Sequence, residues 1–545
     1  MPVKKKSTNV KDYFVKLDDE YKETIRSNAY LGKKGYSISK SIMTEEDIEF
    51  LKKDLFMKPV SMNMNFGAPG GNDETAFPVY RESTSKIYIP RFYGIQRYGL
   101  PDKSELQEGD DISIEFTKTL RDYQTNIVNT YETYCDKPIC CGSSHNANGG
   151  ILEVPCGRGK TVMALKIISD LHKKTLIIVH KEFLMNQWIE RIEEFLPGTK
   201  IGKIQGQTFD IEGKDIVIGM LQSLYDKDYG KDAFSSFGLT VIDEVHRIGS
   251  EQFSKTLFKA VTPYMLGISA TVDRKDGLTK VLYMFIGDKI YSETREDDDP
   301  VCVRAIQYHT NDTEFNDVEY DFRGNPKYST MITKLCAYEP RTIFISRVVK
   351  DLISEDVSKQ IMILCHNRSL LTSLFEKISQ GGFASVGYYV GGMKQKDLQE
   401  TETKQIVLAT YAMAAEALDI KTLSTLIMVT PKTDITQSVG RILRVKHENP
   451  VIVDIIDQHE PFQKQWLQRK RFYKKCNYLI KQATNIKYEN MSLDWKQDND
   501  VWKTVYDPKK PTKKSKSKKN EEDDDEDNNE SKKCLIDVSL FNFDD

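Results

Sequence analysis

Two successive series of short apolar runs constrain the fold of this 545-residue chain more than any other feature. The first series comprises residues 151–154, 176–179, 216–218, 239–242 and 265–268, and the second comprises residues 361–364, 386–390, 406–409, 426–429 and 451–453. Helical spacing lies between the runs, for example over residues 162–171 and 184–195. Continuous apolar strands that alternate with helices are typical of parallel sheets covered on both faces. The sequence therefore predicts two α/β domains in tandem.

Composition excludes several classes of protein. With 39% hydrophobic and 29% charged residues, the chain resembles an ordinary globular protein. No stretch approaches the roughly 18–20 apolar residues that span a bilayer, and the polar, basic N-terminus lacks a secretory signal. The nine scattered cysteines form no disulfide framework. We therefore expect an intracellular protein of a reducing compartment, with no membrane partner.

A phosphate-binding loop is predicted after the first apolar run. The sequence Val154-Pro155-Cys156-Gly157-Arg158-Gly159-Lys160-Thr161 joins that run to a helix. Glycines let backbone N–H groups approach phosphates, and the N-terminus of a helix favours negative charge. Lys160 is expected to reach the β- and γ-phosphates, and Thr161 is expected to bind Mg²⁺. Val154 departs from the pattern, which has glycine at that position.

Two adjacent carboxylates, Asp243 and Glu244, follow the apolar run at 239–242. At the end of a strand they point in different directions, so one can hold Mg²⁺ while the other polarises an attacking water. Alone, an acidic strand end is a weak signal. The phosphate loop upstream in the same domain makes it strong.

Further motifs accompany these two. Ser269-Ala270-Thr271 ends the next run, and Gln124 precedes the first domain. Gln437, Arg441 and Arg444 lie in the second domain, where the two arginines share one helix face that is directed at an anion. The alternative for such a pair is a solvated basic face.

In this order the motifs resemble those of superfamily-2 helicases of the DExH type, over approximately residues 120–456. The resemblance implies two RecA-like domains with ATP in the cleft between them. It implies that Gln124 contacts adenine, that Asp243 holds the metal, that Glu244 is the catalytic base and that Asp419 faces the nucleotide. It also implies that Arg441 and Arg444 act as arginine fingers. His246, Ser269, Thr271 and Gln437 are implied to couple hydrolysis to domain motion.

The same resemblance implies contacts with DNA or RNA. The segments are His180-Lys181 with Gln187-Trp188, Gln222-Ser223, His366-Asn367-Arg368, Gly391-Gly392 and Thr410. One loop departs from the family, because Ala417 stands where glycine is usual in Glu416-Ala417-Leu418-Asp419.

Val154-Pro155-Cys156-Gly157 and Arg274-Lys275-Asp276 resemble a narrower branch. It includes the translocase of the eukaryotic transcription and repair factor and the transcript-release helicases of large DNA viruses such as poxviruses. The implied function is an ATP-dependent helicase or translocase in transcription or repair. A viral protein of this kind is expected in the host cytoplasm or nucleus, or packaged in the virion. The alternative function is a non-hydrolysing clamp or scaffold within a transcription complex.

The predicted organisation is an accessory domain over residues 1–110, a first RecA-like domain over 111–292, a linker or insertion over 293–345 and a second RecA-like domain over 346–490. Residues 491–545 are expected to be mostly disordered, because a lysine run at 509–519 and an acidic run at 521–527 carry almost no apolar residues.

Three features stay outside this assignment. Cys135, Cys140, Cys141 and His145 fit no common zinc spacing and are expected to be a surface insertion with free thiols. Basic and aromatic residues alternate over 463–481, where the two alternatives are nucleic-acid stacking and helix packing. The apolar-acidic segment 535–545 is either a docking peptide for RNA polymerase or another transcription protein, or a segment that packs back on its own domains.

Overall fold

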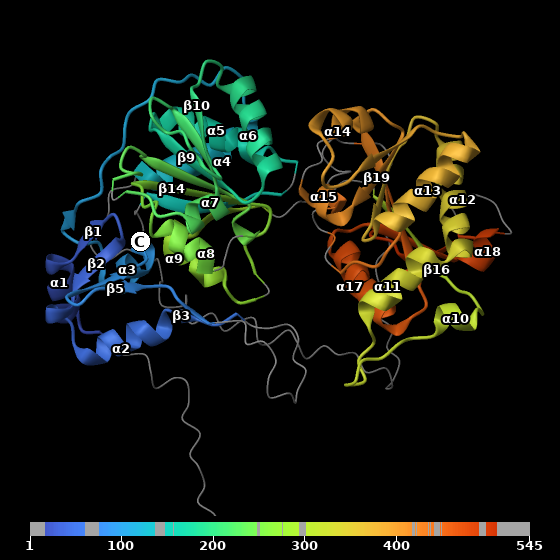
Figure 1. Cartoon of the computed structure of the whole chain (residues 1–545), viewed down its shortest axis with the longest axis horizontal. Helices are drawn as coiled ribbons and strands as arrows, with labels where there is room; N and C mark the ends of the chain where they lie inside the picture. Colours follow the sequence, from blue (N-terminus) through green and yellow to red (C-terminus); the bar gives the residue numbers. More distant parts are fainter. Residues whose placement is uncertain are drawn as a thin grey trace, which may run out of the picture.

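Each series of apolar runs forms one eight-stranded sheet, and each sheet is the centre of a separate lobe in Figure 1. The first sheet has the order β11-β10-β12-β9-β13-β14-β8-β15, and the second has the order β18-β19-β17-β20-β21-β16-β22-β23. All neighbours pair in parallel except the edge strands β11 and β23, which pair antiparallel. The predicted tandem of RecA-like parallel sheets is confirmed.

The computed structural model describes the greater part of the chain. The described residues are 17–59, 76–136, 148–155, 157–230, 232–247, 251–274, 276–293, 301–416, 420, 422–433, 435, 438–440, 447, 450–489 and 498–509. The first sheet and its helices are called lobe 1, and the second sheet and its helices are called lobe 2.

The strands of lobe 1 are β8 (Gly149–Glu153), β9 (Thr175–Val179), β10 (Ile201–Gln205), β11 (Thr208–Phe209), β12 (Ile216–Met220), β13 (Leu239–Asp243), β14 (Tyr264–Ser269) and β15 (Lys289–Ser292). Its helices are α4 (Asp122–Asp136), α5 (Lys160–Leu171), α6 (Glu182–Phe195), α7 (Leu221–Asp226), α8 (Glu251–Leu257) and α9 (Thr279–Ile286).

The strands of lobe 2 are β16 (Cys302–Tyr308), β17 (Gln360–Cys365), β18 (Val386–Tyr389), β19 (Ile406–Thr410), β20 (Leu423–Met428), β21 (Val451–Asp457), β22 (Leu479–Thr484) and β23 (Lys503–Tyr506). Its helices include α10 (Thr313–Asn316), α11 (Tyr328–Ala337), α12 (Glu339–Glu355), α13 (Arg368–Gly381), α14 (Gln395–Glu402), α15 (Tyr411–Glu416), α17 (Glu460–Lys475) and α18 (Asn485–Glu489).

Both faces of each sheet are buried. Along β9, Leu176 and Ile178 belong to one hydrophobic cluster, whereas Ile177 and Val179 belong to another. β17 divides its apolar residues between two clusters in the same alternating way. Side chains of successive strand residues point to opposite faces, so a strand that is apolar at every position must be covered on both.

The N-terminal part forms a smaller domain of its own. Its five-stranded sheet has the order β5-β6-β2-β1-β7 and consists of β1 (Tyr30–Gly32), β2 (Gly35–Ser39), β5 (Arg81–Glu82), β6 (Lys86–Ile89) and β7 (Lys103–Ser104). Its helices are α1 (Asp19–Asn28), α2 (Glu45–Asp54) and α3 (Arg91–Tyr98), and β3 (Phe56–Met57) pairs with β4 (Phe77–Pro78). The helix expected near residues 44–53 is α2, and Thr44 caps its N-terminus.

The N-terminal domain packs directly on lobe 1 (Figure 1). The buried guanidinium of Arg91 donates to the carbonyls of Thr262 and Pro263, both at 2.9 Å. The core of the N-terminal domain is continuous with the cluster on one face of the lobe 1 sheet. The two parts therefore share one hydrophobic core.

The range 293–345, expected to be a linker or insertion, contains a strand of the lobe 2 sheet. Residues 302–308 form β16, which lies between β21 and β22 in the lobe 2 sheet. Arg304 interrupts the apolar pattern, yet it is buried because it forms two hydrogen bonds with Glu355, at 2.7 and 2.8 Å. A paired arginine can occupy a core position, and residues 302–308 thus belong to the sheet of lobe 2.

A second difference lies near the C-terminus. Within the range 491–545, which was expected to be mostly disordered, residues 503–506 form β23 and pair with β22. The side chains of Val501 and Trp502 are buried against lobe 2. The lysine run beyond Lys509, the acidic run and the segment 535–545 lie outside the described residues.

Two aspartates of β21 hold buried arginines from neighbouring helices. Asp457 accepts hydrogen bonds of 2.6 and 2.8 Å from Arg341 of α12, and Asp454 accepts hydrogen bonds of 2.7 and 2.9 Å from Arg469 of α17. Trp466 and Tyr473 of α17 are also buried. These three side chains of α17 therefore pack into lobe 2, which favours the packing alternative for the basic-aromatic stretch.

We expect Asp457→Ala to lower the free energy of unfolding of lobe 2 by about 3–5 kcal/mol, because it leaves a buried arginine without its counter-ion. Urea unfolding followed by hydrogen exchange of β21 measures this loss. The double variant Arg341→Met/Asp457→Leu should recover most of it, since no charge is then buried. Glu460→Ala, which breaks an exposed pair with Lys464, is the control and should change stability little. An equal loss of stability in Asp457→Ala and in Glu460→Ala would contradict this account.

Candidate active site

The candidate site lies at the carboxyl edge of the lobe 1 sheet. β13, β14 and β8 are neighbours and run parallel, so all three end at the same edge. The carboxylates follow β13, the Ser-Ala-Thr segment follows β14 and the phosphate loop follows β8. The parallel pairing brings together motifs that are far apart in the sequence.

Glycines shape the phosphate loop. Gly157 and Gly159 have φ values of +82° and +81°, a region that side chains with a Cβ rarely occupy. Gly159 precedes α5, whose first two residues are Lys160 and Thr161. The N-terminus of α5 thus follows the loop directly, as the sequence predicts.

Val154, where the family pattern has glycine, continues the strand. It is fully buried, and its backbone N–H donates to the carbonyl of Ser269 at 2.9 Å. Pro155 follows it at the start of the turn, and Cys156 lies outside the described residues. The substitution is accommodated because position 154 is part of the core.

Asp243 and Glu244 point to different partners. Asp243 is buried and accepts a hydrogen bond of 2.9 Å from the indole N–H of Trp188. Glu244 lies 3.6 Å from the ammonium of Lys160 and 3.4 Å from His246 Nδ1. A φ of +51° at Glu244 turns the backbone sharply between the two carboxylates.

Burial, together with the neighbouring Glu244 carboxylate, raises the pKa of Asp243 to about 6. The hydrogen bond from Trp188 and the charge of Lys160 act in the opposite direction and lower that pKa. A buried carboxylate of this kind is poised to accept a cation.

Trp188 corrects one sequence expectation. The sequence places it in a segment that contacts nucleic acid, but it is only 1% exposed and its polar atom is bound to Asp243. It lies on the inner face of α6, where it belongs to the same hydrophobic cluster as Ile177 and Val179 of β9. Trp188 therefore supports the carboxylate.

His246 connects the carboxylate turn to the end of β14. Its Nδ1 lies 2.8 Å from the Ser269 hydroxyl, and that hydroxyl donates to the carbonyl of Thr271 at 2.6 Å. Arg274 donates to the carbonyl of His246 and is held by Asp276. In the sequence Arg274 is only a marker of the branch, whereas the structure places it in this network.

Gln124 lies on the phosphate loop. Its side chain is buried and donates to the carbonyl of Arg158 at 3.0 Å, while its carbonyl oxygen accepts from the backbone N–H of Arg121. The Arg158 guanidinium lies over the ring of Tyr123 at 3.9 Å and pairs with Glu293 after β15. Tyr123 and Glu293 were not predicted from the sequence, because each makes its contact only through the fold.

The residues predicted to contact nucleic acid lie at the carboxyl edges of the sheets. In lobe 1, His180-Lys181 follows β9 and the exposed Gln222 follows β12, and these two strands are neighbours. In lobe 2, Gly391-Gly392 follows β18 and Thr410 ends β19. Arg368 donates to the carbonyl of Gly391 and so joins the ends of β17 and β18.

His366 is fixed at the same edge of lobe 2. Its Nδ1 lies 2.9 Å from the Thr430 hydroxyl, and its ring packs 4.7 Å from that of Tyr411. Although much of the ring surface faces solvent, the desolvation around it and the charge of Lys432 lower the pKa of His366 to about 4. The histidine is therefore neutral near pH 7.

Several predicted residues lie outside the described part of the chain. They are Asp419, Gln437, Arg441, Arg444, Cys140, Cys141 and His145. Cys135 is described, and its thiol is buried at the end of α4. Among the described residues no group of three or more histidine, cysteine, aspartate or glutamate side chains is arranged to hold a metal ion. In the same part of the chain, no helix combines the length and apolarity needed to cross a bilayer.

Two protein families match the two lobes. Residues 117–274 match the type III restriction enzyme res subunit family, and residues 345–446 match the helicase conserved C-terminal domain. These ranges contain the phosphate loop, the paired carboxylates and the sheet of lobe 2 from β17 to β20.

The relatives of this chain include proteins of large DNA viruses and a translocase of a cellular organism. A protein of Acanthamoeba polyphaga mimivirus, provisionally named ATP-dependent RNA helicase L396, is 35% identical over 86% of this chain and 88% of its own length. A protein of African swine fever virus, provisionally named ATP-dependent RNA helicase QP509L, is 28% identical over 60% of this chain and 68% of its own length. The DNA 3'-5' translocase XPB2 of Sulfurisphaera tokodaii is 30% identical over 38% of this chain and 44% of its own length.

The two matching domain families, the extent of the mimivirus relative and the motifs gathered at one sheet edge lead to one conclusion. This chain belongs to the ATP-dependent helicase family that includes those proteins of large DNA viruses and the XPB translocase.

Proposed function

We propose that this enzyme couples ATP hydrolysis to movement along, or strand separation of, nucleic acid during transcript release or repair. The observation that carries the proposal is the edge of lobe 1, where Lys160, Glu244, His246 and Ser269 form one connected cluster. Lys160 is the expected phosphate ligand, and Glu244 is the expected base. The names of viral relatives as RNA helicases and of an archaeal relative as a DNA translocase are compatible with this function.

Mg²⁺ fits the residues present. Asp243 is a buried carboxylate whose pKa is raised by burial and by the neighbouring Glu244, and Thr161 lies in the first turn of α5, directly after the phosphate loop. Oxygen ligands of this kind suit Mg²⁺, which neutralises charge on the β- and γ-phosphates when it is bound with ATP. In the proposal, Asp243 and Thr161 hold the ion, Lys160 binds phosphate and Glu244 takes a proton from the attacking water.

The remaining predicted residues have separate roles in this function. Gln124, beside the phosphate loop, contacts adenine, and Asp419 faces the nucleotide. Arg441 and Arg444 act as arginine fingers from lobe 2. The edge residues His180, Lys181, Gln222, Arg368, Gly391, Gly392 and Thr410 bind the nucleic-acid strand. Closure of the lobes around ATP and reopening after hydrolysis then alternate the grip on that strand.

Partners and location follow from the same proposal. Segment 535–545 recruits RNA polymerase or another transcription protein, and a viral enzyme acts in the host cytoplasm or nucleus or is packaged in the virion. ATPase assays with and without DNA or RNA, followed by strand-displacement and translocation assays on DNA, RNA and hybrid substrates, test the function. A protein that binds these substrates but never hydrolyses ATP would instead be the clamp or scaffold.

Lys160→Ala should abolish nucleic-acid-stimulated ATP turnover without unfolding lobe 1, because it removes the charge expected to bind the phosphates. Steady-state ATPase measurements and circular dichroism check the two parts. Lys166→Ala is the matched control, since Lys166 lies on the same helix and pairs with Asp170 at the surface. Substantial turnover by folded Lys160→Ala protein would refute the assignment.

Glu244→Gln should leave ATP binding intact while hydrolysis is lost, because Asp243 still supplies the metal ligand. Fluorescent-nucleotide titration in the presence of Mg²⁺ measures binding, and single-turnover assays measure the chemical step. If nucleotide affinity falls as far as turnover, the division of labour between the two carboxylates is wrong.

Trp188→Phe should raise the Mg²⁺ concentration needed for half-maximal turnover, by about 10–100-fold as for other residues that orient a metal ligand. The phenyl ring keeps most of the packing but loses the N–H that donates to Asp243. Trp466→Phe, at a buried tryptophan of lobe 2, controls for loss of core packing. Similar Mg²⁺ requirements in both variants would show that the hydrogen bond to Asp243 has no such effect.

A further inference from the structure

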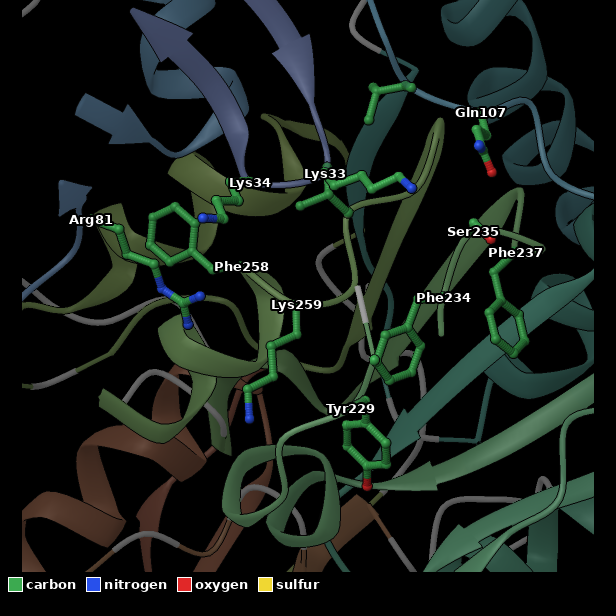
Figure 2. A pocket seen from close by; sticks show the side chains of 13 residues that line it. Lys33, Lys34, Arg81, Gln107, Tyr229, Phe234, Ser235, Phe237, Phe258 and Lys259 are labelled. Atoms are coloured by element: carbon green, nitrogen blue, oxygen red, sulfur yellow. The ribbon is translucent and has the colours of Figure 1, made fainter. Parts of the chain in front are cut away.

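A cavity lies between the N-terminal domain and lobe 1 (Figure 2). Its volume is about 440 Å³, within the range of pockets that enclose ligand groups. Phe234 and Phe237 lie on the segment that leads into β13, and Phe258 and Lys259 lie on the segment that leads into β14. The cavity is therefore at the amino end of β13 and β14, whose carboxyl ends carry the paired carboxylates and the Ser-Ala-Thr segment.

The wall of the cavity is aromatic. The rings of Tyr229 and Phe234 meet edge to face at 5.3 Å, and Phe234 lies 6.2 Å from Phe237. Phe258 lines the opposite side in Figure 2. Phe237 and Phe258 are only 1% and 3% exposed, so little of either ring face is open for stacking. Such a wall suits apolar side chains, whereas bases need open ring faces on which to stack.

The rim of the cavity is cationic. Lys33 and Lys34 are exposed in the turn between β1 and β2, Arg81 lies over the ring of Phe258 at 5.1 Å, and Lys259 donates to three carbonyls at the end of α7. The nearby described carboxylates are Asp232, which pairs with Lys33, Asp228, which interacts with Arg81 and Lys259, and Asp226, which interacts with Lys259. Four positive charges thus face three negative charges, which leaves the rim attractive to an acidic ligand.

This chain contains a segment with the complementary chemistry. Residues 535–545 read Leu-Ile-Asp-Val-Ser-Leu-Phe-Asn-Phe-Asp-Asp. In an extended conformation, alternate side chains share one face, so Phe541, Phe543 and Asp545 point the same way at intervals of about 6.6–6.8 Å. Two aromatic groups followed by a carboxylate match an aromatic wall bordered by lysines.

The segment can also reach the cavity. The 26 residues from Lys510 to Leu535 span roughly 85–95 Å at full extension. A compact chain of this length has a radius of gyration of roughly 24 Å, so the extended connection is more than about three times as long as that radius. Tethering of this kind raises the local concentration of a peptide to about the millimolar range, which favours even a weak contact.

We propose that residues 535–545 dock in the cavity between the N-terminal domain and lobe 1 of their own chain, with Phe541 and Phe543 against the aromatic wall and the aspartates at the lysine turn. A transcription protein that recruits the enzyme through this segment then competes with the internal site. The inference does not depend on ATP hydrolysis, since the cavity lies at the opposite edge of the sheet.

Carbodiimide cross-linking of the full-length protein tests the proposal, because this reagent joins an ammonium to a carboxylate in direct contact. We expect cross-links from Lys33 or Lys34 to Asp544 or Asp545, and none from Lys103, which is exposed on the same domain but outside the cavity. Mixed light and heavy isotope-labelled chains distinguish links within one chain from links between two chains.

Variants of the segment provide the second measurement. Phe541→Ala/Phe543→Ala in the full-length chain should abolish these cross-links and speed hydrogen exchange over residues 229–237, while basal ATPase activity is retained. Lys103→Glu should change neither. Unaltered cross-links and exchange in the Phe541→Ala/Phe543→Ala variant would overturn the proposal.

Two other results would also overturn it. Cross-links found only between differently labelled chains would assign the cavity to a second copy. Protection of residues 229–237 by a single-stranded oligonucleotide, lost on Lys33→Glu/Lys34→Glu substitution and unaffected by the segment variant, would assign it to nucleic acid. Loss of ATPase activity in Lys160→Ala with the cross-links unchanged would separate this inference from the proposed function.

Discussion

The parallel pairing of β8, β14 and β13 is the constraint on which the candidate site depends. Hydrogen bonding in this order brings the ends of three distant segments to one edge, and the bond from Val154 N–H to the Ser269 carbonyl continues the pairing into the phosphate loop. Because both faces of the sheet are buried, a slip of one residue in either pair would exchange side chains between the two hydrophobic clusters and shift the motif residues along the strands. The contact between Lys160 and Glu244 is a consequence of that register.

Around this edge, side chains from neighbouring segments hold the phosphate loop and the carboxylate turn in place. Trp188 fixes Asp243, Gln124 contacts the loop carbonyl of Arg158, and Arg274 contacts the carbonyl of His246. In lobe 2, the equivalent edge is ordered by the bond from Arg368 to Gly391 and by Thr430, which holds His366. In the proposed cycle these contacts transmit changes at the nucleotide to the strand-binding edge.

The second lobe and the N-terminal domain solve a different physical problem, the burial of charge. Asp454 and Asp457 of the central strand β21 neutralise Arg469 and Arg341, and Arg91 satisfies its buried guanidinium partly with backbone carbonyls of lobe 1. Removing one partner of such a pair leaves a charge in a region of low dielectric constant. These contacts therefore specify how the helices and the N-terminal domain seat on the sheets.

The amino-acid sequence by itself determined the two parallel sheets, the phosphate loop and the paired carboxylates, because apolar periodicity and glycine spacing are local properties of the chain. It did not reveal β16, since Arg304 breaks the apolar pattern and is buried only through Glu355, or β23, since a strand of four residues has little local signal. It also assigned Trp188 to nucleic acid. Only the tertiary structure decided that this indole faces Asp243. Only the packing of the N-terminal domain on lobe 1 created the cavity between them. Both features depend on residues that are distant in sequence and meet when the sheets and helices assemble.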